Sequence, residues 1–395
     1  MKKADRLNKL EMSKIRMTSK LMDQLEAEGR DIIIFTYGEP NFDTPKYIKD
    51  ACTDALYNGH TKYSDYNGPI HFRQAVCDKY ERENGLKFFP DQVISTHGSA
   101  QAAYLVLTTF LNPGDEIIIP NPMYNIYRII AEICGAAVKE YKLKEENEFQ
   151  IDLKEMERLI TDKTKMIVIC SPSNPIGSVL TEENLRGLGE LVKDKDLLIC
   201  SDEIYDRLVY DGVEAVSPAK FDTMRDKTII INGFSKAFAM TGWRMGIAAG
   251  PAEVIFHMNK IHQFTTMSAG TTSQYAALEA LTSPVRDEEI DVMRQEYDER
   301  RHLMVDGFRA MGLKVVEPEG AFYVFPSIKE TGLTSMEFCS RLLQEQKVAV
   351  IPGDAFGSCG EGYIRCSYAY SKDVIKKCLE KIAAFVAQFD LEQNA

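Results

Sequence analysis

The sequence has little of what several classes of protein require. Its six histidines show no ligand spacing with cysteine or with each other, so we expect no metal site. Its nine cysteines are odd in number and contain no C-x-x-C pair, which predicts no disulfide framework and favours a reducing cytoplasm. No stretch is long and apolar enough to cross a bilayer, and residues 1–10 lack an apolar signal-peptide core. We therefore expect a soluble cytoplasmic protein with no membrane partner.

Positively charged residues are also fewer than negatively charged ones. The chain has 47 lysines and arginines against 59 aspartates and glutamates, a net charge of −12. This balance disfavours nucleic-acid partners, which need clustered cations, although one local arginine can still bind an acidic substrate. Repeats, low-complexity tracts and flexible Gly/Ser linkers are absent. With 395 residues and 45% hydrophobic residues, the chain is long enough for a sizeable core and for two domains.

Short apolar runs alternate with helical patterns along most of the chain. This alternation predicts an α/β fold with a mainly parallel sheet and helices on both faces. The apolar runs are Gln92–Ser95, Glu116–Ile119, Lys165–Cys170, Leu197–Ser201, Thr228–Asn232 and Met245–Ala249.

The two ends of the chain have a different pattern. An amphipathic helix is predicted over Ser13–Gly29 and a short strand over Asp31–Phe35. A charged helix begins near Asp287 and leads into a smaller α+β portion. The further elements predicted there are strands over Lys314–Val316, Ala321–Phe325 and Gly362–Ser367 and a terminal helix over Lys372–Phe389.

The most informative segment is residues 233–246, GFSKAFAMTGWRMG, which directly follows the strand-like run Thr228–Asn232. Lys236 and Arg244 therefore lie on a turn beyond the carboxyl end of a strand, where open α/β sheets bind ligands. The Lys236 amine can form a Schiff base with a cofactor aldehyde, and Ser235 and Arg244 can bind a phosphate. Taken alone, however, Lys236 is better interpreted as an ordinary surface lysine.

Other polar residues also follow predicted strands. The segment 96–101, THGSAQ, opens a helix whose first N–H groups can bind a phosphate, or whose serine is simply a cap. Tyr124 can lie over a heteroaromatic ring, and Asn174 can donate a hydrogen bond to a phenolate oxygen. An exposed loop tyrosine and a turn-forming asparagine are the simpler interpretations.

Two charged residues complete this set. Asp202 stands at the end of a buried run, where an unpaired carboxylate is costly, so it is a candidate partner for a pyridinium nitrogen. Tyr205 is within reach of the same ring. Arg365 lies near a predicted strand end and can bind a carboxylate with both arms of its guanidinium group, unless it is an ordinary surface arginine.

The order of these motifs carries more weight than any one of them. The segments YGEPNFDTP, GSAQA, SPSNPIG, SDEIY, FSK and GAFYVFP follow one another along nearly the whole chain. In this order they resemble the fold type I pyridoxal-phosphate enzymes, and specifically the class I/II aminotransferases. The likeness is greatest to the branch that holds bacterial aspartate, aromatic and branched-substrate aminotransferases.

The resemblance implies an architecture. We expect a mainly parallel seven-stranded sheet sandwiched by helices in a large pyridoxal-phosphate-binding domain, residues 46–286. A smaller α+β domain would be formed by both termini, residues 1–45 plus 287–395. The resemblance also implies a homodimer with shared active sites, in which Tyr63 reaches the phosphate of the neighbouring subunit.

The resemblance also assigns roles, with pyridoxal 5'-phosphate as the cofactor. Lys236 would form the Schiff base and then move the proton, Asp202 would keep the pyridine nitrogen protonated, and Tyr205 would assist catalysis from the 3-oxygen. The cofactor-binding residues implied are Ser99, Ala100, Tyr124, Asn174, Asp202, Tyr205, Ser235, Lys236, Arg244 and Tyr63. The substrate-binding residues implied are Gly38, Arg365, Tyr37 and Asn174.

The expected reaction is ping-pong transamination between an L-amino acid and a 2-oxo acid such as 2-oxoglutarate. Gly233 stands where many relatives have a phosphate-binding serine. Ala100 replaces the lysine of some aspartate-specific relatives, and residues 261–270 contain no arginine. Aspartate, aromatic and neutral donors therefore all stay open. A carbon–sulfur β-lyase or a decarboxylase on the same scaffold is the alternative, since that chemistry shares every cofactor contact. A non-enzymatic ligand sensor is a third hypothesis, but it would need a DNA-binding module, and we expect no basic N-terminal extension or spare length for one.

Overall fold

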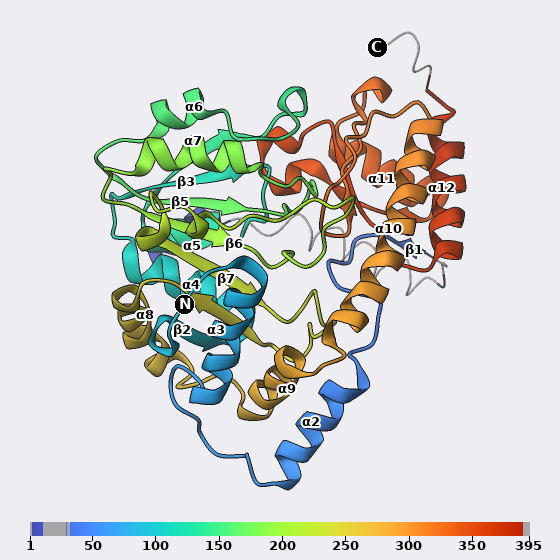
Figure 1. The fold of residues 1–395 in the computed structure, drawn as a ribbon. Coiled ribbons are helices and arrows are strands. Elements are labelled where there is room, and N and C mark those ends of the chain that lie inside the picture. Colours follow the sequence, from blue (N-terminus) through green and yellow to red (C-terminus); the bar gives the residue numbers. More distant parts are fainter. Residues whose placement is uncertain (1, 11–28, 30–31, 390–395) are drawn as a thin grey trace.

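The computed structural model describes residues 2–10, 29 and 32–389. Its centre is a seven-stranded sheet in the order β2-β8-β7-β6-β5-β3-β4 (Figure 1). These strands are β2 (Val93–Thr96), β8 (Gly246–Ala249), β7 (Thr228–Gly233), β6 (Leu198–Asp202), β5 (Thr164–Cys170), β3 (Glu116–Asn121) and β4 (Ala137–Lys142). Only β8 runs antiparallel to its neighbours, so the mainly parallel sheet expected from the sequence is confirmed.

Six of the seven strands coincide with the apolar runs of the sequence. The seventh, β4, has the sequence AVKEYK and lies at the edge of the sheet, where only Tyr141 is buried. An edge strand buries few of its side chains, which is why β4 carries no continuous apolar signal.

Helices cover both faces of the sheet because the buried strand residues alternate in direction. Ile229 and Ile231 pack with helices α4, α5 and α8, whereas Ile230 points to the opposite face and packs with α3 and α9. Helices α6 and α7 cover that opposite face at the other end of the sheet, over Ile167. The helix bounds are α2 (Lys46–Tyr57), α3 (Ile70–Asn84), α4 (Gly98–Phe110), α5 (Ile126–Cys134), α6 (Leu153–Leu159), α7 (Glu182–Val192), α8 (Ala252–Thr265) and α9 (Thr271–Thr282).

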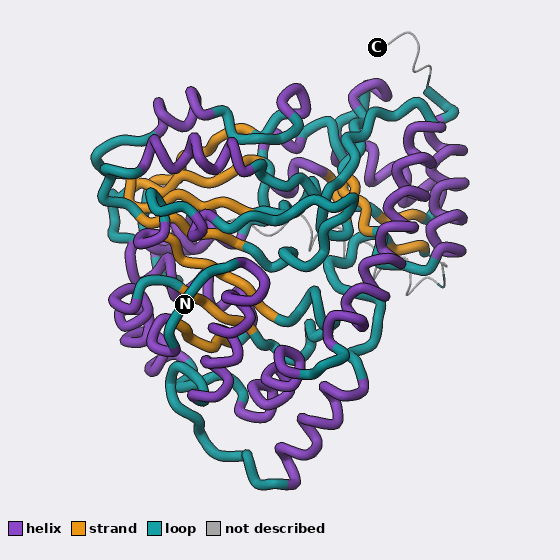
Figure 2. The backbone as a smooth tube through the Cα atoms, in the orientation of Figure 1, coloured by secondary structure: helices purple, strands orange, loops and turns teal. Residues whose placement is uncertain are grey.

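A second group of elements packs beyond one end of the sheet (Figures 1 and 2). It contains the helices α10 (Arg286–Ala310), α11 (Ser335–Gln346) and α12 (Lys372–Val386) and the short strands β1 (Ile33–Ile34), β9 (Tyr323–Val324), β10 (Val348–Ala349), β11 (Ile351–Pro352) and β12 (Ile364–Ser367). Strand β1 pairs in parallel with β10, so the N-terminal segment lies beside elements from the C-terminal third. Strands β11, β12 and β9 form an antiparallel sheet of their own.

Several predictions for the ends of the chain need correction. Residues 314–316 are not a strand, because a single backbone hydrogen bond, from Ser327 N–H to the Lys314 carbonyl, does not make a ladder. Strand β9 covers only the centre of the predicted Ala321–Phe325, and α12 ends three residues before Phe389. The helix predicted over Ser13–Gly29 lies outside the described residues, apart from Gly29. Among the helices that the structure describes, none is long and apolar enough to cross a membrane.

Candidate active site

A cavity of about 450 Å³ lies at the carboxyl ends of the central strands. The turns after β5, β6 and β7 meet there with the start of α4 and with the N-terminal segment 36–39. The residues of the predicted site that line it are Tyr37, Gly38, Ser99, Ala100, Tyr124, Asn174, Asp202, Tyr205, Ser235, Lys236, Arg244 and Arg365. The structure thus brings together every predicted site residue except Tyr63.

Lys236 stands on the turn that follows β7. Its ammonium group donates a hydrogen bond to the Gly38 carbonyl and lies 5.7 Å from the centre of the Tyr205 ring. Burial lowers the pKa of Lys236 to about 8, and the positive charge of Arg365 acts in the same direction. A substantial fraction of this amine is therefore neutral near physiological pH, as a nucleophile or a general base requires.

Asp202 ends strand β6 and faces the same cavity. Burial raises the pKa of its carboxyl group, and two hydrogen bonds oppose that rise. The Tyr127 hydroxyl donates to Oδ2 at 2.6 Å, and the Ile204 N–H donates to Oδ1 at 3.3 Å. Sequence reasoning missed Tyr127. Tyr127 lies in the first turn of α5, shortly after Tyr124. The sequence offered one signal for it, because a buried carboxylate such as Asp202 needs a hydrogen-bond donor.

An anion-binding corner forms where α4 begins. Gly98 has a φ of +74°, and a Cβ at that position would lie only 2.5 Å from Nη2 of Arg244. The guanidinium group therefore lies directly against the backbone from which Ser99 starts the helix. Ser235 is buried and lines the same cavity. A helix N-terminus, hydroxyl groups and a guanidinium group together provide the donors that a phosphate needs.

Arg365 lies on β12 and is only 3% exposed. Its Nη1 donates to Oδ1 of Asn174 at 3.0 Å, and its Nη2 donates to the Thr36 carbonyl at 2.7 Å. The Nε of Arg365 is buried and has no hydrogen-bond partner among the described residues. Nη1 and Nη2 each carry a second N–H beyond those that bond to Asn174 and Thr36, and these remain for a carboxylate. Because Oδ1 of Asn174 already accepts from Arg365, the Asn174 amide can present its N–H groups to the cavity.

Aromatic side chains form much of the remaining wall. The hydroxyls of Tyr205 and Tyr323 are 2.8 Å apart, and both residues are buried. Tyr124 and Tyr37 are about half exposed, and Ala100 is exposed on the first turn of α4. Tyr323 was not among the predicted site residues, although the GAFYVFP motif contains it.

Tyr63 is the one predicted residue that the cavity of this chain does not contain. It is 80% exposed and lies in the segment between α2 and α3. Any role for Tyr63 in an active site therefore requires a second subunit.

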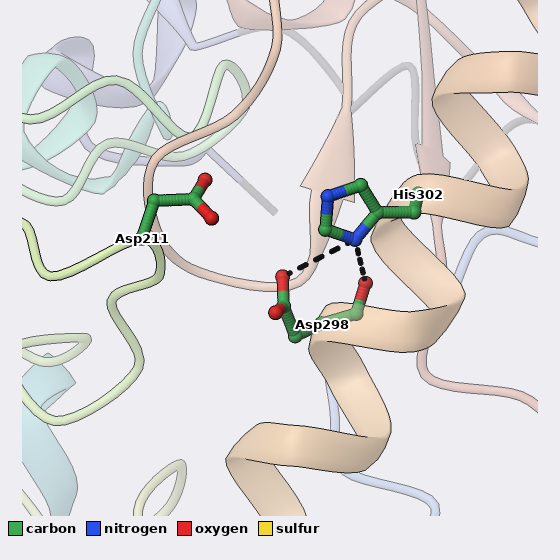
Figure 3. Close-up of side chains that lie close together, drawn as sticks. All are labelled: Asp211, Asp298 and His302. Carbon is green, nitrogen blue, oxygen red and sulfur yellow. Dashed lines mark hydrogen bonds and ion pairs between the residues drawn. The ribbon is translucent and has the colours of Figure 1, made fainter.

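One group of potential metal ligands lies away from this cavity. Within the described part of the chain, Asp211, Asp298 and His302 place ligand atoms within 4.8 Å of one another. Figure 3 shows His302 directed toward Asp298 on α10, with Asp211 on a neighbouring loop. The buried guanidinium group of Arg301 makes 2.7 Å ion pairs with both aspartates. Since Arg301 already supplies the positive charge, we interpret this cluster as a structural ion-pair network rather than a metal site.

Comparisons with known proteins agree with this geometry. The family model described as aminotransferase class I and II matches residues 30–382. The chain is 40% identical to an aromatic-amino-acid aminotransferase of Thermococcus litoralis and to an aspartate aminotransferase of Pyrococcus abyssi, with 96% of this chain and 97% of each relative covered. Among solved structures, an aspartate aminotransferase of Thermus thermophilus with maleate superposes with a TM-score of 0.93 at 37% identity, covering 97% of this chain and 99% of that one.

These findings define first an enzyme of the transferase class, with the fold type I architecture expected from the sequence. The chain belongs to the class I and II aminotransferases. It transfers amino groups between amino acids and 2-oxo acids, and the comparisons do not favour the alternative of a lyase or a decarboxylase. Dependence on pyridoxal phosphate is general in this family.

Proposed function

We propose that this aminotransferase binds pyridoxal 5'-phosphate in the cavity beside Lys236 and works by a ping-pong mechanism. The observation that carries the proposal is the pairing of a buried lysine amine, with its pKa lowered to about 8, with a buried carboxylate, Asp202, in one cavity. When bound, the cofactor would supply an aldehyde that captures amino groups and a pyridine ring that accepts electrons.

The residues present fit this cofactor. Lys236 would hold the aldehyde carbon, and the Asp202 carboxylate would hold the proton of the pyridine nitrogen. Asn174 and Tyr205 would donate to the 3-oxygen, and Tyr124 would cover the ring. The residues that would hold the phosphate are Ser99, Ala100, Ser235 and Arg244. The absence of a side chain at Gly98 keeps open the corner beside Arg244, which a Cβ would fill.

The side chains have separate tasks in the proposed reaction. Arg365 would bind the substrate α-carboxylate through the remaining N–H groups of its guanidinium, and the Gly38 N–H would assist it. Lys236, once released as a free amine, would take the proton from the substrate Cα and return it one position away. The segment 36–39 lies over the cavity, with Gly38 bonded to Lys236, and would limit access of water.

The donor side chain would face Ala100, Tyr37 and Tyr124. We propose aspartate, aromatic or neutral L-amino acids as donors and 2-oxoglutarate as an acceptor. The names of the Thermococcus litoralis and Pyrococcus abyssi relatives support both the aromatic and the aspartate choice. The small Ala100 and the two half-exposed tyrosines leave room for a large side chain.

A homodimer in the cytoplasm is part of the proposal. Tyr57, Tyr63 and Phe264 are 88%, 80% and 87% exposed, and a second subunit could remove this aromatic surface from water. The nine cysteines are free thiols, as is usual in a reducing compartment.

We also propose residues 46–286 as the large domain and residues 1–45 plus 287–395 as the small one. In support, all strands of the central sheet fall within the first range, and β1 pairs with β10.

Absorbance spectra of the purified protein test this function directly. Single amino acids are added without any oxo acid, and we expect the cofactor band to move to that of the amino form and to return with 2-oxoglutarate. The amino acids that move the band identify the donor class. Accumulation of pyruvate or ammonia with no band shift would instead indicate a lyase, and a protein with no cofactor band would refute the proposal.

The variant Lys236→Ala tests the mechanism. It should fold, bind cofactor without a covalent bond and lose turnover, whereas Lys195→Ala, which removes an exposed lysine that does not line the cavity, should keep turnover. Retained transamination by Lys236→Ala would rule out the role of this lysine.

A further inference from the structure

Tyr323 lies where three parts of the cavity meet. Its hydroxyl is 2.8 Å from the hydroxyl of Tyr205, and its ring lies 4.4 Å from the guanidinium carbon of Arg365. We propose that Tyr323 is a positioning residue that orients the Tyr205 hydroxyl toward the cofactor and holds the Arg365 guanidinium plane toward the substrate. This inference rests on the proposed function, because it deepens the roles given there to Tyr205 and Arg365.

The direction of the hydrogen bond between Tyr205 and Tyr323 follows from their burial. Tyr205 and Tyr323 are 3% and 0% exposed, so neither hydroxyl can turn to bulk water. Each hydroxyl has a single hydrogen to donate. If Tyr205 donates to a cofactor oxygen in the cavity, the hydrogen between the two tyrosines must come from Tyr323. Hydrogen bonds in such a chain polarise one another, so Tyr323 would make Tyr205 a stronger donor.

Arg365 is held by aromatic rings as well as by hydrogen bonds. The Tyr323 ring lies 4.4 Å from the guanidinium carbon, and the Phe356 ring lies 4.9 Å from the same atom. Asn174 and the Thr36 carbonyl accept from the two terminal nitrogens at 3.0 and 2.7 Å. A planar guanidinium held by aromatic rings and by two acceptors loses little further freedom when a carboxylate binds. Tyr323 therefore contributes through its ring, separately from its hydroxyl.

Gly38 lies opposite the Tyr323 hydroxyl. A Cβ at position 38 would lie 2.9 Å from Oη of Tyr323. Gly38 is not among the glycines with positive φ, so the requirement is one of space rather than of backbone conformation. The Tyr323 hydroxyl thus fills the space beneath the segment that also bonds to Lys236.

Two substitutions separate the hydroxyl from the ring. Tyr323→Phe removes only the hydroxyl, so Tyr205 becomes a weaker donor to the 3-oxygen. We expect the pH at which the absorbance of the bound cofactor changes to move upward by about half a unit, with the KM for the amino acid within about twofold of wild type. Tyr323→Ala also removes the ring, and we expect it to raise that KM about tenfold.

Tyr368→Phe is the matched control. Tyr368 is also fully buried, and its hydroxyl donates at 3.1 Å to the Ala321 carbonyl. When the Tyr368 hydroxyl is removed, this carbonyl still accepts a hydrogen bond from the Tyr210 hydroxyl. We expect this control to leave the absorbance midpoint and the KM unchanged. The inference is overturned if Tyr323→Phe has the wild-type midpoint, or if Tyr368→Phe moves it equally. A wild-type protein that shows no cofactor absorbance would refute the proposed function instead, so the two failures are distinguishable.

Discussion

Burial acts on the two ionisable side chains at the centre of the cavity in the same sense, by disfavouring charge. It lowers the pKa of Lys236 to about 8 and raises the pKa of Asp202, where the Tyr127 hydroxyl opposes it. The lysine is thus kept partly neutral, and the carboxylate keeps a donor that favours its ionised form. Folding into this arrangement costs stability, because a charged amine loses water without an ion-pair partner close by.

That cost predicts a pH-dependent stability. Between about pH 8 and pH 10.5 the unfolded Lys236 binds a proton and the folded one does not, so its destabilising effect is complete below pH 8 and disappears as the pH rises through this window. We expect Lys236→Met to raise the free energy of unfolding of the cofactor-free protein by about 1–3 kcal/mol at neutral pH. The difference from wild type should shrink toward zero near pH 10.5.

Urea unfolding at a series of pH values measures this difference. Lys195→Met serves as the control, because Lys195 is exposed and its substitution should give the same small effect at every pH. A gap between Lys236→Met and wild type that stays constant or widens with pH would contradict the explanation.

The start of α4 depends on two glycines that let separate elements touch. Gly98 brings the backbone against Arg244, and a Cβ on Gly246 of β8 would lie 2.5 Å from the Ser99 nitrogen. The helix N-terminus, the neighbouring strand and the arginine are therefore packed without any intervening side chain. This contact fixes the N–H groups that would face the phosphate.

Substitution of Gly98 by alanine should therefore affect ligand binding more than folding. We expect Gly98→Ala to weaken binding of pyridoxal 5'-phosphate about tenfold or more, because the new Cβ displaces Arg244. Equilibrium dialysis with the cofactor measures the affinity. Gly85→Ala is the control, since Gly85 has a similar φ of +65° with no atom near a new Cβ. Equal losses of affinity in both variants would show that backbone strain alone is responsible.

At the scale of the whole molecule, the cavity is assembled from segments distant in sequence. Thr36 and Arg365 are 329 positions apart and share a hydrogen bond, and Gly38 is bonded to Lys236 across 198 positions. The parallel pairing of β1 with β10 brings the N-terminal segment to this place. A site of this kind forms only when both ends of the chain have folded against the central sheet.

The proposed dimer predicts complementation between defective subunits. If Tyr63 acts in the neighbouring subunit, Lys236→Ala and Tyr63→Phe subunits in one hybrid dimer should together form one site with both wild-type residues. We expect subunits mixed after mild unfolding and refolding to regain activity well above the sum of the two separate variants. Size-exclusion chromatography checks the dimer. Activity equal to that sum would contradict a role for Tyr63 in the active site of the neighbouring subunit.

Much of this protein could be predicted because its strongest signals are local. Six apolar runs located six of the seven central strands, and the polar residues that follow them lie together because parallel strands end at one edge of a sheet. The edge strand β4 gave no such signal, and the strand expected at Lys314–Val316 did not form. Both cases depend on neighbouring strands rather than on local composition.

The sequence alone determined the α/β class, the motifs that line the cavity and the family they resemble, because period, turn chemistry and motif order are properties of short segments. Only the tertiary structure decided which other side chains contact and orient the predicted site residues. Tyr127 bonds to Asp202 and Tyr323 lies between Tyr205 and Arg365 only because separate elements fold together. The lowered pKa of Lys236 has the same origin, since burial comes from the whole fold and is not encoded at any one position.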